Sequence, residues 1–255
     1  MERIPVLILS GSRLGEEDIL AKAGGVPHKA LLPVGNIPMV ERVYRAIKNA
    51  EIDSKIFVAS EDEEWIKKSN LKDVTFIPSR PNLPETIFTS LEITGYPCLV
   101  VTADHALLEA KWLHEFLFKS KNFSADLTCA IVLKESVENI PFKSVRTYIS
   151  LSDIQFSGCN LFLLKNPSSK KIVTLWKEIY HLRKSPLRMV RILGFTFLLR
   201  ALFRRLSSSA LLGRIKALTN ASLEFVILED GHAAIDVDKI ADWELVEALI
   251  KLKEN

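Results

Sequence analysis

Hydrophobic positions along the first half of this chain alternate between short continuous apolar runs and longer stretches with helical spacing. Continuous runs of about four to eight apolar residues are typical of strands buried on both faces of a sheet. They predict strands at residues 5–10, 55–60, 74–77, 97–102 and 126–133. The stretches between them predict helices at residues 39–50, 62–68, 84–93 and 107–120. The alternation indicates an α/β protein with a mostly parallel sheet covered by helices on both faces.

The pattern changes after residue 134. Further elements are expected there: strands at 144–150, 156–164 and near 223–229, and helices at 167–184 and 241–253. No repeat, low-complexity tract or linker interrupts the 255 residues. We therefore expect a single domain over residues 1–255, with two halves at 1–133 and 134–255.

Composition narrows the functional classes. An apolar content of 48% is enough for one sizeable core, and a net charge of +3 is too small to indicate nucleic-acid binding. The three cysteines are widely separated and form no CxxC or Cys/His cluster, so we expect buried, reduced thiols rather than a zinc site. The first residues enter a strand directly and show no signal peptide. We expect a cytoplasmic protein.

The loop after the first strand carries the first chemical signal. It reads Ser10-Gly11-Ser12-Arg13-Leu14-Gly15. Small residues let backbone N–H groups approach phosphate oxygens, and Arg13 and Lys29 supply positive charge. Open α/β sheets bind nucleotides at the carboxyl ends of their strands, where this loop lies. The sequence therefore predicts a site for a nucleoside triphosphate.

Acidic residues follow later strands. Asp104 comes directly after the apolar run 99–102, which places its side chain at the same edge of the sheet. The alternative for Asp104 is a helix N-cap, and His105 is expected to start that helix rather than to bind a ligand. Alternation along a strand places Asp236 and Asp238 on one face, and Asp242 has the spacing of an N-cap for the last helix.

These motifs together resemble a known family. The run Leu9 to Gly15, followed by Lys29, Leu31, Gly35, Pro38 and Met39, resembles the N-terminal signature of MobA-like nucleotidyltransferases, which have a GT-A-like fold. Asp104 matches the family's metal-binding aspartate, and residues 234–242 resemble its closing acidic signature. The resemblance is best over the first 110 residues. It implies a three-layer, Rossmann-like sheet, here with a helical C-terminal insertion.

The resemblance also implies site roles. Mg²⁺ would be held by Asp104 and Asp236, with Asp238 as the close competitor, while Arg13 and Lys29 would be the catalytic cations. Residues 1–133 become the nucleotide-binding half and residues 134–255 the acceptor-facing half. Nucleotide contacts are expected from Leu9, Ser10, Gly11, Ser12, Asn82, Thr86 and Ser90. Acceptor contacts are expected from Arg146, with Lys143 beside it, and from Gly158 and Asn160.

One segment is distinctive by charge. No acidic residue occurs from Ile179 to Leu223, while nine arginines and lysines are interleaved with apolar runs. We expect residues 183–218 to be helical, and their apolar runs are too short to span a bilayer. Three interpretations stay open: contact with an anionic membrane surface at the inner face, packing on the domain or against a second subunit in a homodimer, and, least favoured, nucleic-acid binding.

The sequence thus predicts a Mg²⁺-dependent enzyme that transfers a nucleoside monophosphate to a small phosphorylated alcohol, polyol, sugar or lipid head-group precursor and releases pyrophosphate. The base stays open among cytosine, guanine and uracil. One alternative is a glycosyltransferase with a nucleotide-sugar donor, although Asp104-His105-Ala106 lacks the Asp-x-Asp motif usual in that class. Another is a non-catalytic protein that binds a nucleotide or a membrane surface.

Overall fold

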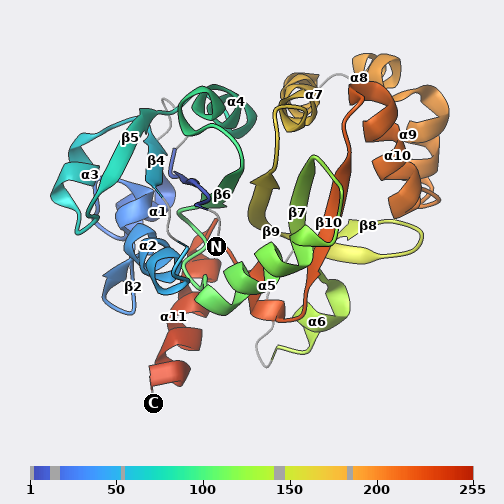
Figure 1. Ribbon diagram of the computed structural model, residues 1–255. Helices are drawn as coiled ribbons and strands as arrows, with labels where there is room; N and C mark the ends of the chain where they lie inside the picture. The colour runs from blue at the N-terminus through green and yellow to red at the C-terminus, as the bar shows by residue number, and fades with distance from the viewer. Residues whose placement is uncertain (1–2, 12–17, 53–54, 141–146, 183–185, 255) are drawn as a thin grey trace.

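The first strand shows how the chain builds two cores. All four residues of β1 (Val6–Leu9) are buried. Val6 and Ile8 belong to one hydrophobic cluster, and Leu7 and Leu9 to another, because successive side chains point to opposite faces of a sheet. A strand that is apolar on both faces needs helices on both sides, and the computed structural model has them (Figure 1). The structure describes residues 3–11, 18–52, 55–140, 147–182 and 186–254.

The sheet has eight strands in the order β10-β7-β9-β6-β1-β4-β5, with β8 beside β9. Only β9 runs against the others, since it pairs antiparallel with β6, β7 and β8 while the remaining pairs are parallel. The predicted mostly parallel α/β sheet is confirmed. The other strand bounds are β4 (Ile56–Ser60), β5 (Val74–Pro78), β6 (Cys98–Thr102), β7 (Leu127–Leu133), β8 (Ile149–Ser150), β9 (Gln155–Leu164) and β10 (Leu223–Leu228).

Helices cover the two faces of the sheet as separate layers (Figure 1). The larger core lies under α2 (Met39–Asn49), α5 (Ala110–Lys121) and α11 (Ile240–Glu254). The second core lies under α4 (Leu83–Thr94), α7 (Ser169–Leu182) and α10 (Ser208–Thr219). The shorter helices are α1 (Ile19–Ala23), α3 (Glu64–Lys68), α6 (Lys134–Glu138), α8 (Pro186–Leu193) and α9 (Phe195–Leu202). Two 3₁₀ turns complete the list, η1 (Lys29–Leu31) and η2 (Gly231–Ala234).

Most predicted elements are present close to their predicted ranges, but the shortest strands were not predicted. The hairpin of β2 (Pro33–Val34) and β3 (Ile37–Pro38) turns at Gly35 and Asn36, whose φ angles are 54° and 60°. Two residues per strand carry no periodicity, but two positive φ angles are what a tight hairpin turn requires. Of the predicted strand 144–150, Ile149–Ser150 forms β8, and residues 141–146 lie outside the described part of the chain.

The cysteines form no disulfide with one another. Cys98 and Cys159 are buried as expected, and Cys129 is half-buried. Burial among apolar groups raises the pKa of Cys98 to about 11 and that of Cys129 to about 12, so both thiols are neutral at physiological pH. Among the helices in the described residues, none has both the length and the apolar content needed to cross a bilayer.

Two glycines form a matched pair for a stability test. A Cβ atom on Gly231 in η2 would overlap the backbone carbonyl of Ser136 in α6, whereas a Cβ atom on Gly213 in α10 would meet nothing within 4 Å. We expect Gly231→Ala to lower the free energy of unfolding by about 1–3 kcal/mol through overpacking. Gly213→Ala should raise it by roughly 0.5–1 kcal/mol because it reduces the freedom of the unfolded chain. Urea denaturation of both variants checks the pair, and equal effects would contradict the packing around η2.

Candidate active site

Lys29 joins two segments that are far apart in the sequence. Its Nζ lies 3.1 Å from Oδ2 of Asp104 and 3.2 Å from Oδ1 of Asp238. The two acidic segments also contact each other directly, because the backbone N–H of Val237 donates to the carbonyl of Asp104 at 3.0 Å. Asp104 follows β6, so this cluster lies at the carboxyl ends of the parallel strands. The structure therefore brings Lys29, Asp104, Asp236 and Asp238 to one place.

The surroundings of Lys29 keep its side chain protonated. Its side chain is only 18% exposed. Burial by itself lowers the pKa of Lys29, but the carboxylates of Asp104 and Asp238 more than offset this, and the pKa rises above the usual 10.5. Lys29 is therefore an ammonium ion at physiological pH.

His28 precedes Lys29 in the sequence and stabilises the turn that carries it. Its Nδ1 accepts the backbone N–H of Ala30 at 3.1 Å and so caps η1, the turn that carries Lys29. Its Nε2 therefore carries the proton and donates to Oε1 of Glu61 at 3.0 Å, while the ring stacks on Trp65 with centroids 4.7 Å apart. A hollow of about 430 Å³ opens beside these residues. Sequence reasoning missed His28, since only its position next to Lys29 marked it.

Asp104 is oriented by its own strand. The hydroxyl of Thr102 donates to Oδ1 of Asp104 at 2.6 Å, which leaves Oδ2 toward Lys29. The N-cap alternative for Asp104 is wrong, because α5 begins only at Ala110 with Glu109 at its cap position. His105 does not start the helix either: it is buried and stacks on Trp112 with centroids 5.9 Å apart.

The closing acidic segment is held from two sides. Ile235 and Val237 are buried, Asp236 is half-buried and Asp238 is exposed. Burial therefore alternates as predicted, although the segment is extended chain rather than a sheet strand. Asp242 is not the N-cap of α11. It lies in the first turn, and its Oδ2 accepts the backbone N–H groups of Asp238 and Lys239, both at 3.2 Å. This is the reach-back of a capping box, and it fixes the backbone of Asp238.

Asn160, expected to contact the acceptor, lies against the closing acidic segment. Its Nδ2 donates to Oδ2 of Asp236 at 2.7 Å. The register between β7 and β9 shifts at this point, and Asn160 has a φ angle of 53°, a left-handed conformation that asparagine tolerates. Gly158 lies on the same strand, exposed, with no atom within 4 Å of where a Cβ would be. Arg146 and Lys143 lie outside the described residues.

The side chains expected at the nucleotide divide into two groups. Gly11 is exposed at the loop, and Ser12 and Arg13 lie outside the described residues. The side chains of Leu9, Ser10 and Ser90 are buried. Leu9 packs in the second core, and the hydroxyl of Ser10 donates to the carbonyl of Ala59 at 2.8 Å.

Two other residues expected at the nucleotide organise the start of α4. Asn82 is the N-cap of α4 and accepts the N–H of Glu85 at 3.0 Å. The hydroxyl of Thr86 accepts the N–H of Arg80 at 2.9 Å and donates to the carbonyl of Asn82 at 3.0 Å. Both therefore shape the loop before α4.

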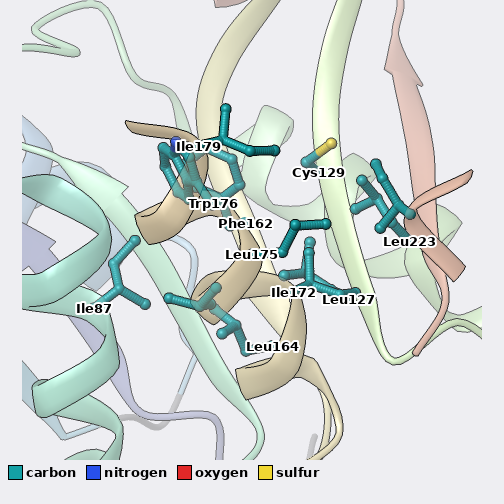
Figure 2. A pocket seen from close by; sticks show the side chains of 12 residues that line it. Ile87, Leu127, Cys129, Phe162, Leu164, Ile172, Leu175, Trp176, Ile179 and Leu223 are labelled. Atoms are coloured by element: carbon teal, nitrogen blue, oxygen red, sulfur yellow. The ribbon is translucent and has the colours of Figure 1, made fainter. Parts of the chain in front are cut away.

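A separate apolar cavity of about 250 Å³ lies on the other side of the fold, between the sheet and the helices α7 and α10 (Figure 2). Figure 2 shows Trp176 beside Phe162, with Cys129 and Leu223 at the far wall. Every lining residue is apolar or a cysteine. A triphosphate needs charged or N–H donors, so this cavity is not the nucleotide site.

Comparison with known families identifies the family of the chain. The model of the MobA-like NTP transferase domain matches residues 10–158, which is more than half of the chain. The chain belongs to the MobA-like NTP transferase family. Membership in this family makes the protein a nucleotidyltransferase. It sets aside the glycosyltransferase and the non-catalytic interpretations.

Solved structures agree with the fold of a MobA-like NTP transferase. A hypothetical transferase from Thermus thermophilus is 29% identical, with 94% of this chain and 99% of that chain covered and a TM-score of 0.79. CMP:2-keto-3-deoxy-manno-octonic acid synthetase in complex with CTP is 11% identical, with 99% and 100% covered and a TM-score of 0.60. CTP:phosphocholine cytidylyltransferase from Streptococcus pneumoniae is 13% identical, with 97% and 99% covered and a TM-score of 0.56. No curated protein matches the chain.

Proposed function

We propose that this protein uses Mg²⁺ to transfer a nucleoside monophosphate from CTP, GTP or UTP to a small phosphorylated acceptor, with release of pyrophosphate. The acceptor is a phosphorylated alcohol, polyol or sugar, or a lipid head-group precursor. The observation that carries the proposal is the ammonium group of Lys29 between Asp104 and Asp238, where the segment that also carries Asp236 contacts the end of β6. Phosphoryl chemistry depends on charge neutralisation and positioning, and this cluster offers both.

The donor set fits Mg²⁺. Asp104 and Asp236 supply two carboxylates from neighbouring segments, and the ammonium group on Oδ2 of Asp104 shows that a cation is accommodated there. Within the ranges that the structure describes, no group of three or more His, Cys, Asp or Glu side chains is arranged to hold a metal. Mg²⁺ is usually bound through one or two carboxylates together with substrate phosphates, so Asp104 and Asp236 would be enough. When bound, the ion would neutralise charge on the triphosphate.

The residues of the chain would then act as follows. An oxygen of the acceptor phosphate attacks the α-phosphorus, and the bond from that phosphorus to the bridging oxygen of the β-phosphate breaks, so the electron pair leaves with pyrophosphate. Lys29 exchanges its carboxylate partners for α-phosphate oxygens and stabilises their charge. Arg13 would do the same for the departing phosphates, as proposed from its motif alone. Gly11 offers its backbone, and Asn160 keeps Asp236 in orientation.

Cytosine is the first base to test. Two structurally similar proteins are a CMP:2-keto-3-deoxy-manno-octonic acid synthetase in complex with CTP and a CTP:phosphocholine cytidylyltransferase, although identities of 11% and 13% support only the shared fold. Nothing in the described residues selects a base, because the loop around Ser12 and Arg13 lies outside them. CTP, GTP and UTP therefore all stay candidates for the nucleotide donor.

The decisive experiment is a matrix of nucleoside triphosphates against phosphorylated alcohols, polyols, sugars and lipid head-group precursors, with pyrophosphate as the readout. We expect pyrophosphate with one triphosphate only when a phosphorylated acceptor is present. The same acceptor without its phosphate is the matched control, and a chelator should stop the reaction. Pyrophosphate that forms equally well with unphosphorylated acceptors would contradict the proposed acceptor class.

A further inference from the structure

Helices α8 and α9 form a basic hairpin at one end of the molecule. We call residues 186–205 the α8–α9 hairpin; in Figure 1 it lies beyond α7 and α10, far from β5 and α3. Five of its arginines are exposed to solvent: Arg188, Arg191, Arg200, Arg204 and Arg205. The chain between Ile179 and Leu223 contains no carboxylate side chain at all. The hairpin therefore presents positive charge without acidic residues among it.

Several apolar residues of α9 are exposed rather than packed against the protein. Six of its eight residues are apolar, yet none is buried. Phe195, Leu198, Leu199 and Leu202 have the i, i+3, i+4, i+7 spacing of one helix face. Phe195 is 62% exposed and Leu202 is 75% exposed, while Leu198 and Leu199 between them are half-buried, so both ends of this face are open to solvent. Phe203, which follows, is 67% exposed and extends it.

The opposite side of the hairpin holds it in place. Phe197 packs against the small core around Ile131, Phe156 and Leu206. Arg214 of α10 donates to the carbonyls of Leu193 and Ile192, both at 3.0 Å, and so caps the end of α8. The outward face is therefore a fixed feature of the fold, held by contacts behind it.

We propose that the α8–α9 hairpin docks on the surface of an anionic lipid bilayer. Phe195, Leu202 and Phe203 would enter the boundary between head groups and acyl chains, and the surrounding arginines would contact anionic head groups. A helix lies in the plane of the interface when an apolar face is combined with a basic one. The charge complementarity and the outward apolar face are two independent observations for this occupant.

Two other partners fit the hairpin less well. In a two-fold dimer the same patch meets itself, which would set these arginines against each other. A nucleic acid would match the positive charge of the hairpin. It would leave the three large apolar side chains without a contact, since phosphate groups are bound by cationic and N–H groups. A bilayer with anionic lipid uses both features at once.

Vesicle flotation tests the proposal with the full-length protein. We expect co-flotation with vesicles of phosphatidylcholine and phosphatidylserine at low salt, weaker flotation at high salt, and little with phosphatidylcholine alone. Arg200→Gln, Arg204→Gln and Arg205→Gln should each lower the partition coefficient about fivefold, and the triple variant roughly a hundredfold. Replacing Phe195, Leu202 and Phe203 by serine should remove the binding that persists at moderate salt.

Matched controls come from other exposed positions. Phe118 on α5 is 72% exposed, and Phe118→Ser should leave flotation unchanged. Changing the exposed lysines Lys48, Lys67 and Lys68 to glutamine removes the same total charge and should have at most a small effect. The proposal is overturned if the wild-type protein does not float with anionic vesicles at low salt, or if this lysine variant loses as much as the arginine variant. It is also overturned if the hairpin variants dissociate a dimer or release a nucleic acid while flotation is absent.

Discussion

Asp104→Asn and Asp236→Asn should each lower the rate of pyrophosphate release about a thousandfold or more, while the protein stays folded. An amide keeps the shape of the side chain but loses the negative charge that a hard cation requires. Losing one well-placed electrostatic group in a site of this kind costs about a hundredfold to a thousandfold, and loss of a metal ligand acts on every phosphate contact. Rates at saturating triphosphate, with thermal unfolding curves for both variants, measure the effect.

Asp238 provides the internal control for this prediction. It is 68% exposed and contacts Lys29, so Asp238→Asn should cost far less than Asp236→Asn. The two residues differ in their partners, because the amide of Asn160 holds Asp236. If Asp238→Asn abolished turnover while Asp236→Asn retained it, the second carboxylate of the site would have been assigned to the wrong residue.

Much of this site could be predicted because its parts are local. Asp104 follows a strand of five buried residues. An apolar run followed by an acidic residue can be recognised in the sequence alone. Lys29 lies in a motif of small and apolar residues whose spacing is fixed by η1 and the β2–β3 hairpin. The strand order did not have to be known, because the carboxyl ends of parallel strands meet at one edge.

Other features depend on contacts that a sequence does not display. The predicted helix at 107–120 began early because Leu107 and Leu108 continue the apolar pattern, although they are buried in the turns before Ala110. Asn160 reaches Asp236 only because the register of β9 shifts against β7, which depends on pairing between distant strands. The basic segment reads as one helical stretch, but Gly194 and the residues from Phe203 to Ser207 divide it into three helices.

Replacing Lys29 by methionine should reduce turnover about a hundredfold to a thousandfold, through loss of a cation directed at the phosphates. The same change should lower the free energy of unfolding of the ligand-free protein by about 1–2 kcal/mol, because the carboxylates of Asp104 and Asp238 then face each other without a counterion. The raised pKa of Lys29 means that its ion pairs are complete at neutral pH and are lost only above about pH 10.5, as the lysine deprotonates. Steady-state kinetics and urea denaturation at neutral pH measure both effects.

The variant Lys29→Arg separates the two roles of this residue. A guanidinium ion restores a positive charge between the carboxylates, so stability should return close to that of the wild type. Turnover should stay low, because the planar, larger group cannot replace a compact ammonium ion at the α-phosphate. Added Mg²⁺ should recover part of the stability of Lys29→Met, since a second cation can then neutralise Asp104. Wild-type turnover in Lys29→Met would remove Lys29 from the reaction and leave it as a structural counterion between two carboxylates.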